Sequence, residues 1–322
     1  MKINKTSITR RDFLKGTALA SVGLTFGIDK IWSVVSLQGE GGERSKVIIG
    51  KSEKIMDEEN RVNQKVMDTL LDEVMKKYTQ KKDVNSAWRE FFSSKDVVGI
   101  KVCDQMTRTH NELVISIVKN LKSIGIPDDK IIIFERGRGG FGEKGIFNRR
   151  ESFGYSSNSI SKVITENATA LINVPGTKAH WLSGIGVCLK NWCGAVTRIN
   201  VRDIDVAFVI HKNSCEDMGL LSFSPDIKNK LRLNIVDALR PLAHGGPQVD
   251  PRYLWQNREI FVSTDQVAID AVCLQKIQEK RREIKGGDWT LYPPPLHIAT
   301  AQNKYKLGIA DLKRIDIERI VV

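Results

Sequence analysis

The residues best suited to chemistry lie in one short stretch near the middle of the chain, 178–191 (KAHWLSGIGVCLKN). Lysine supplies a fixed positive charge for a phosphate or a carboxylate, and histidine exchanges protons near neutral pH or binds a metal ion. The stretch therefore predicts a pocket for a small anionic ligand or a metal. The candidate catalytic residues are Lys178, His180 and Lys190, and the candidate ligand-binding residues are Gly184, Gly186 and Asn191.

Three aspartates form a second group of candidates, because carboxylate oxygens bind hard divalent cations. Asp237 and Asp265 each follow an apolar run, and Asp270 lies within the apolar helical pattern VAIDAV. All three are candidate metal ligands, but Asp265 is also a favoured helix N-cap. Lys178 and Lys190 have the alternative of pairing with Asp237 or Asp265. An unpaired Asp270 would be costly to bury, so a lysine or a metal ion is expected beside it.

A turn rich in glycine, His244-Gly245-Gly246, completes the candidate ligand-binding residues. Glycine lets a ligand or another backbone approach closely, so the turn is expected to lie against one of them. A second such turn, 137–142 (GRGGFG), can present backbone N–H groups to an anion. A flexible surface loop is the favoured interpretation of that turn. His297 either faces the same cleft or begins the last helix.

The apolar pattern predicts an α/β fold, with a mainly parallel sheet flanked by helices in three layers. A strand–helix–strand order is typical of a right-handed βαβ unit, and ligands of such sheets bind beyond the carboxyl ends of the strands. The expected strands are 47–49, 97–102, 131–134, 170–174, 231–236, 260–263 and 315–322. The expected helices are 60–79, 111–124, 158–166, 265–281 and 297–306.

Length and composition describe a folded globule, with 322 residues, 41% hydrophobic residues and a net charge of +12. No apolar run reaches the roughly 18 residues that a membrane span needs, which excludes a multi-pass membrane protein. The basic surface favours a small anion or a membrane surface as partner. Nucleic acid is not expected, because no basic motif with interleaved aromatic residues is present.

The five cysteines are widely spaced and include no C-x-x-C pair, so the chain contains no iron–sulfur or zinc motif. Cys103 and Cys273 lie in apolar runs and are predicted to be buried thiols. Whether Cys188 and Cys193 form a disulfide is left undecided by the sequence, since an oxidising compartment would allow it.

The first 45 residues differ from the rest: they hold seven basic and four acidic side chains, which leaves about +9 on residues 46–322. A basic start is followed by the uncharged stretch 16–28 (GTALASVGLTFGI), as in an export signal. Residues 9–15 (TRRDFLK) resemble the twin-arginine (Tat) signature, carried by Arg10, Arg11, Phe13 and Leu14. An amphipathic helix with chance arginines is the alternative.

This resemblance implies the Tat translocase as a partner and export of an already folded protein, often with a cofactor inserted beforehand. The expected location is the periplasm, or the outer side of the cytoplasmic membrane if the segment remains as an anchor. Residues 1–45 are thus predicted as a signal or anchor segment and residues 46–322 as a single α/β domain.

Several short motifs in the body resemble the domain of unknown function 362 family. Its Pro-x-x-Lys-x-His segment is similar to 175–180 (PGTKAH), and its Leu-Lys-Asn-x-x-Gly segment is similar to 189–194 (LKNWCG). Further similarities lie at 235–238 (IVDA), 244–247 (HGGP), 263–270 (STDQVAID) and 307–309 (LGI), so the resemblance extends over about residues 85–320. Many relatives are Tat-exported or carry ferredoxin-type clusters, whose cysteines are missing here.

Two functions follow as expectations. The first is an anion- or metal-binding pocket that serves an extracytoplasmic redox or cofactor-related system, with His180 as proton carrier and Lys178 and Lys190 as charge clamps. The second is a non-enzymatic accessory protein that docks a membrane or redox partner through its basic surface. A fainter similarity to the nickel-dependent lactate racemase family would imply a cofactor held covalently on a lysine. No specific reaction follows from these residues.

Overall fold

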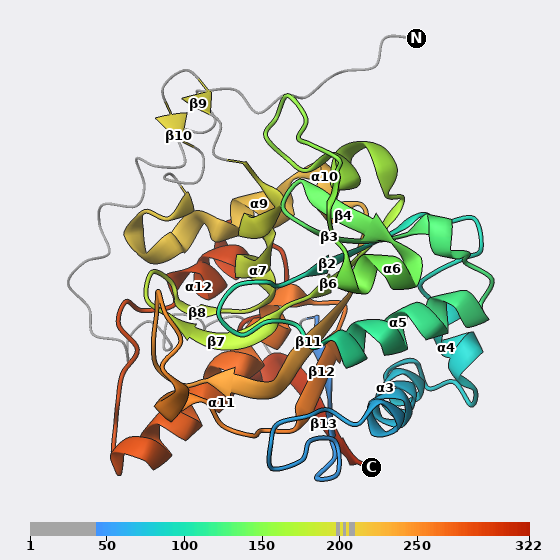
Figure 1. The fold of residues 1–322 in the computed structure, drawn as a ribbon. Coiled ribbons are helices and arrows are strands. Elements are labelled where there is room, and N and C mark those ends of the chain that lie inside the picture. The colour runs from blue at the N-terminus through green and yellow to red at the C-terminus, as the bar shows by residue number, and fades with distance from the viewer. Residues whose placement is uncertain (1–42, 198–199, 202–203, 206–209) are drawn as a thin grey trace. The chain divides into compact units, whose positions relative to one another are not determined.

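A mixed sheet of eleven strands lies at the centre of the part of the chain that the computed structural model describes, residues 43–197, 200–201, 204–205 and 210–322 (Figure 1). The strand order is β13-β1-β12-β11-β6-β2-β3-β4-β5, and the β7–β8 hairpin pairs with β11. The strands are β1 (Ser45–Lys51), β2 (Val98–Val102), β3 (Ile131–Glu135), β4 (Arg138–Phe141), β5 (Glu151–Ser152), β6 (Ala170–Val174), β7 (Gly176–His180), β8 (Gly184–Gly186), β11 (Leu231–Leu242), β12 (Glu259–Ser263) and β13 (Ile315–Val321). A separate pair is formed by β9 (Asn200–Val201) and β10 (Ile204–Asp205).

The middle of the sheet is parallel, as the sequence predicts. β11, β6, β2 and β3 are neighbours and run in the same direction. Every residue of β2, β3 and β6 is buried, which explains why these strands are apolar runs without alternation. Antiparallel strands flank this parallel set, with β12 beside β11 and β4 beside β3.

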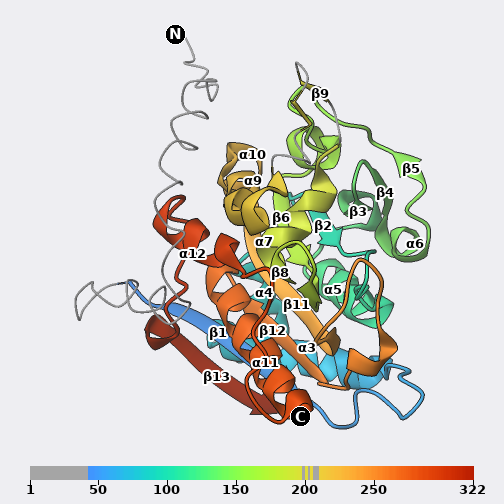
Figure 2. The same ribbon diagram turned by 90° about the vertical axis from the view of Figure 1, so that its left-hand side faces the viewer.

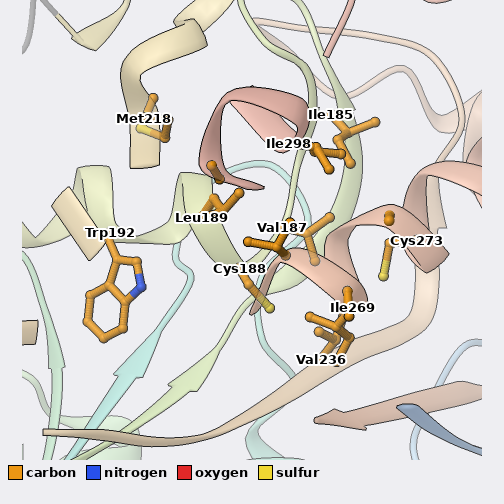
Figure 3. Packing of buried hydrophobic residues seen from close by; sticks show 14 of the residues in the cluster. Ile185, Val187, Cys188, Leu189, Trp192, Met218, Val236, Ile269, Cys273 and Ile298 are labelled. Atoms are coloured by element: carbon orange, nitrogen blue, oxygen red, sulfur yellow. The ribbon is translucent and has the colours of Figure 1, made fainter. Parts of the chain in front are cut away.

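Helices cover both faces of the sheet, so the three-layer α/β prediction is confirmed (Figure 1, Figure 2). One face packs against α3 (Gln64–Thr79), α4 (Val84–Arg89), α5 (Asn111–Ser123) and α6 (Gly142–Phe147). The other face packs against α7 (Cys188–Asn191), α9 (Gly219–Phe223), α10 (Pro225–Lys228), α11 (Gln266–Lys285) and α12 (Leu296–Asn303). Figure 3 shows residues of this second core, among them Cys188, Trp192 and Cys273.

Several predicted elements differ from the structure in extent. The strand predicted at 231–236 continues to Leu242, so Asp237 lies inside β11 rather than beyond its end. The helix predicted at 158–166 is a single wide turn, Val163–Asn167. The remaining short turns are Asp128–Lys130, Trp192–Ala195, Asn213–Met218, Pro251–Tyr253 and Leu312–Arg314.

The favoured loop interpretation of 137–142 is wrong. Residues Arg138–Phe141 form strand β4, which turns back antiparallel to β3, and Gly139 and Gly140 are buried. The absence of side chains serves packing here: a Cβ on Gly145 of α6 would lie 2.2 Å from the carbonyl oxygen of Gly140. The turn therefore packs against protein.

Residues Glu43–Val322 form one compact unit. The predicted export segment falls almost entirely on residues 1–42, outside the described residues. No helix in the described ranges combines the length and the apolar character needed to cross a membrane.

Candidate functional site

A cavity of about 690 Å³ opens at the carboxyl ends of the parallel strands. Cys103 follows β2, Glu135 ends β3, and Lys178 and His180 lie on β7, directly after β6. α7 then brings its last two residues into the same lining. The structure therefore brings together five of the six candidates in the stretch 178–191, namely Lys178, His180, Gly186, Lys190 and Asn191. This is the edge at which open α/β sheets bind ligands.

The β7–β8 hairpin sets the spacing of the first three of these residues. Lys178 lies opposite Gly186 and His180 lies opposite Gly184. A Cβ on Gly186 would lie 3.3 Å from Cε of Lys178, so glycine leaves room for the lysine side chain. Gly184 has a φ of +72°, and a Cβ there would lie 2.7 Å from the carbonyl oxygen of Pro293. Gly184 therefore supports the turn and does not line the cavity.

Both lysines are largely buried, with 6% of Lys178 and 9% of Lys190 exposed. Nζ of Lys178 lies 3.1 Å from Sγ of Cys103. Nζ of Lys190 lies 2.8 Å from Nε2 of His211 and 3.4 Å from Sγ of Cys193. Within the described ranges neither lysine forms an ion pair with a carboxylate, so the expected alternative of pairing with an aspartate is not what the structure shows.

The protonation of His180 is disfavoured by its burial and by these two lysines. Burial, followed by the charges of Lys190 and Lys178, lowers the pKa of His180 to about 2. Its Nδ1 accepts a hydrogen bond of 3.1 Å from the backbone N–H of Leu182, which leaves the proton on Nε2. Without a bound anion, His180 is therefore a neutral hydrogen-bond donor at neutral pH.

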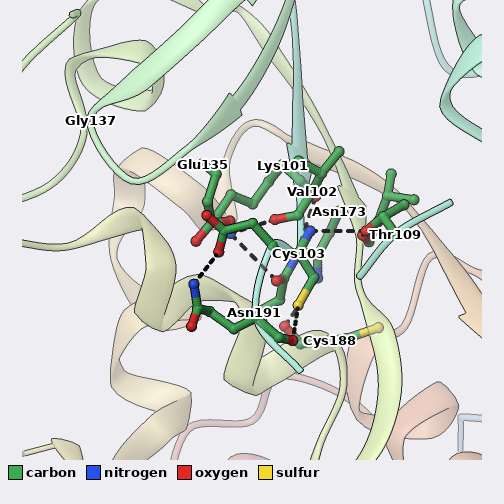
Figure 4. Close-up of polar contacts among 12 residues, drawn as sticks. Lys101, Val102, Cys103, Thr109, Glu135, Gly137, Asn173, Cys188 and Asn191 are labelled. Carbon is green, nitrogen blue, oxygen red and sulfur yellow. Dashed lines mark hydrogen bonds and ion pairs between the residues drawn. The ribbon is translucent and has the colours of Figure 1, made fainter. Parts of the chain in front are cut away.

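A buried polar network supports the floor of the cavity (Figure 4). Lys101 of β2 forms an ion pair with Glu135 and donates to the carbonyl of Val102 at 2.8 Å. Lys101 also lies 3.4 Å from Oδ1 of Asn191, whose Nδ2 donates to Oδ1 of Asn173 at 2.8 Å. Asn191 is thereby held from two neighbouring strands. Burial raises the pKa of Glu135, and Lys101 opposes that shift.

The position of α7 depends on Asp270 of α11. The carboxylate of Asp270 accepts hydrogen bonds from the backbone N–H groups of Cys188 at 2.7 Å and Leu189 at 3.1 Å. These are N–H groups of the first turn of α7, which lack partners within the helix. The buried carboxylate is therefore held by backbone N–H groups, and no ion pair in the described ranges joins it to the expected lysine. Burial raises the pKa of this carboxyl to about 7.

Comparison with protein families adds one finding. The family model described as "Domain of unknown function (DUF362)" matches residues 148–275. The match supports the resemblance to the DUF362 family that the sequence motifs indicate. Searches of curated proteins and of solved structures gave no match. The DUF362 match includes β7, β8, α7 and the first half of α11, whereas Cys103 and Glu135 of the cavity precede it.

The structure does not bring the three candidate metal ligands, Asp237, Asp265 and Asp270, together at one site. Asp265 caps α11, accepting from the N–H groups of Val267 at 2.8 Å and Ala268 at 2.9 Å, and thus fulfils the alternative expected from the sequence. Asp237, on β11, is hydrogen-bonded to His110, which precedes α5. Across the described residues, no group of three or more His, Cys, Asp and Glu side chains is arranged to hold a metal ion.

The turn at His244, Gly245 and Gly246 also lies outside the cavity lining. His244 packs against the rings of Tyr253 and Trp289, with centroids 5.0 and 4.8 Å away. A Cβ on Gly246 would lie 2.4 Å from Cδ1 of Trp181. The expected close approach is therefore to another part of the chain.

His297 lies within α12 and is completely buried. Neither of its ring nitrogens has a hydrogen-bond partner in the described part of the chain, and burial lowers its pKa to about 3. It does not line the cavity.

The residues that the sequence-based reasoning missed include Lys101, Glu135 and His211, and it also missed the lining role of Cys103. A signal was present for Lys101, because a lysine within the apolar run VGIKV requires a buried partner. Cys103 is buried as predicted, with 7% exposed, yet its thiol contacts Lys178 of the cavity. All five cysteines are free thiols.

Proposed function

We propose that the cavity lined by Lys178, His180 and Lys190 binds a small anion. The observation that carries this proposal is the presence of two buried ammonium groups without a carboxylate partner among the described residues. Burying unpaired charge is costly, and a bound carboxylate or phosphate would neutralise it. The neutral His180 adds an N–H donor, and Asn191 adds a side-chain amide. This donor set suits an anion better than a divalent cation.

Isothermal titration calorimetry with malonate tests this proposal. Lys178→Ala and Lys190→Ala should each weaken malonate binding by about tenfold or more, since a charge-assisted hydrogen bond contributes about 1.5–3 kcal/mol. Lys190→Arg should retain part of the affinity. The matched control is Lys313→Ala, because Lys313 is exposed and is not part of the cavity lining. Equal affinities in wild type and both alanine variants would contradict the proposal.

We also propose that residues 1–45 direct export through the Tat translocase and that the anion site works outside the cytoplasm. The support is the resemblance of 9–15 (TRRDFLK) to the Tat signature. Replacing Arg10 and Arg11 together by lysine should leave the protein in the cytoplasm, because the receptor reads the arginine pair. Cell fractionation of the full-length chain measures this, with Lys5→Arg as the control. Undiminished export of the double variant would exclude this route.

A further inference from the structure

A second cavity, of about 510 Å³, lies beside the first and shares only Cys103 with its lining. It is formed by the loop 103–110 after β2, the start of α5, and part of β11. The loop is folded back on itself: the backbone N–H of Cys103 donates to Oγ1 of Thr109 at 2.9 Å, and Oγ1 of Thr109 donates to the carbonyl of Val174 at 2.6 Å. The wall of this cavity is therefore fixed to the central strands.

A histidine and an aspartate are joined at this cavity. Nδ1 of His110 lies 2.8 Å from Oδ2 of Asp237, and the backbone N–H of His110 donates to the same oxygen at 2.7 Å. The other carboxylate oxygen accepts from the N–H of Leu239 at 3.2 Å. The side chain of Asp237 is 2% exposed and that of His110 is 25% exposed. Asp237 thus orients the imidazole, and Nε2 of His110 has no partner among the described residues.

The same lining is rich in positive charge. Arg108, Arg149 and Arg240 contribute to it, and none of the three is paired with a carboxylate in the described ranges. The guanidinium groups of Arg108 and Arg149 donate instead to backbone carbonyls. Glu112 is the one acidic residue of the lining besides Asp237. α5 begins here without a capping side chain, which adds the partial positive charge of its first turn.

We propose that this second cavity binds a tetrahedral oxyanion, either inorganic phosphate or the phosphate group of a monoester. The arginines supply charge and paired N–H donors, which match the geometry of phosphate oxygens. Because Nδ1 of His110 donates to Asp237, Nε2 can donate to the bound oxyanion in the imidazolium form, which the carboxylate of Asp237 favours by raising the pKa of His110. Asp237 is a positioning residue in this site. The two linings share only Cys103, so substitutions of other residues test this site separately from the first cavity, which is called the lysine cavity below.

Isothermal titration of the full-length protein with inorganic phosphate and with glycerol 3-phosphate tests this site and separates the two ligand sources. Arg240→Ala and Arg149→Ala should each weaken binding of the preferred probe by about tenfold. His110→Asn retains a donor toward Asp237 but removes Nε2, so binding should weaken severalfold. His110→Gln places an amide near the position of Nε2 and should recover part of the affinity. Unfolding midpoints verify that each variant is folded.

Two of the variants already named, Lys190→Ala and Arg240→Ala, distinguish this site from the lysine cavity. Lys190→Ala should leave phosphate binding at the second cavity unchanged, and Arg240→Ala should leave malonate binding at the first cavity unchanged. The surface control is Arg282→Ala, whose side chain is 60% exposed. If phosphate binding is lost in Lys190→Ala and kept in Arg240→Ala, the second site does not exist as proposed. The same conclusion follows if no arginine or histidine variant changes phosphate binding.

Discussion

Replacing Lys101 by methionine is expected to lower the free energy of unfolding by about 3–5 kcal/mol, because it leaves the buried carboxylate of Glu135 without its partner. The Lys101 side chain has no exposed surface, and that of Glu135 is 8% exposed. Methionine has a similar length and no charge, so the loss reports the broken ion pair rather than a cavity. Chemical denaturation at neutral pH measures the difference.

The double variant Lys101→Met/Glu135→Gln is the decisive comparison. Removing both charges should restore a large part of the stability, because a neutral amide is far less costly to bury than a lone carboxylate. Lys119→Met provides the surface control, since Lys119 pairs with Asp68 at 2.7 Å on the exterior and should cost about 1 kcal/mol or less. If Lys101→Met resembles that control, the ion pair does not stabilise the site.

Replacing Asp270 by alanine is expected to destabilise the protein by at least about 2 kcal/mol, since each buried N–H left without a partner costs about 1–3 kcal/mol. The affected groups are the N–H groups of Cys188 and Leu189, which open α7. The change should also displace Lys190 and Asn191, so the affinity for the anion probe should fall together with stability. Denaturation and titration of the same sample measure both effects.

The pH dependence gives a second test of Asp270. Its pKa is raised from 3.8 to about 7 in the folded state, so the folded protein holds this proton more strongly than the unfolded chain. The contribution of Asp270 to the free energy of unfolding is therefore largest at low pH. It falls by about 1.4 kcal/mol per pH unit as the pH rises from 3.8 to about 7. Asp270→Asn should remove this part of the slope, whereas Asp288→Asn, at an exposed position, should keep it.

Much of the fold could be predicted because its central strands are apolar throughout. β2, β3 and β6 are buried on both faces, so their sequences are distinguishable without any knowledge of their partners. β4 escaped prediction for the opposite reason: its buried residues are glycines, which carry no hydrophobic signal. The extension of β11 past Asp237 was equally hidden, because a polar residue inside a strand depends on a partner elsewhere, here His110.

The residues of the candidate site likewise differ in how far they could be predicted from local sequence. Lys178, His180 and Lys190 lie close in the sequence and on one hairpin and helix, so local spacing already places them together. The three aspartates lie farther along the chain, and each accepts hydrogen bonds from a different set of backbone N–H groups. Asp270 illustrates why residue type alone misleads, since its partners are amide groups that every sequence possesses.

The pairing of β1 with the edge strand β13 has a kinetic consequence. All seven residues of β1 pair in parallel with β13, from Ser45 opposite Ile315 to Lys51 opposite Val321. This neighbour cannot form until residues 315–321 have been synthesised, so the edge of the sheet closes late during production of the chain. Contacts of such long sequence separation also slow folding. A chain interrupted before residue 315 leaves β1 with an open edge, which is prone to aggregate with other chains.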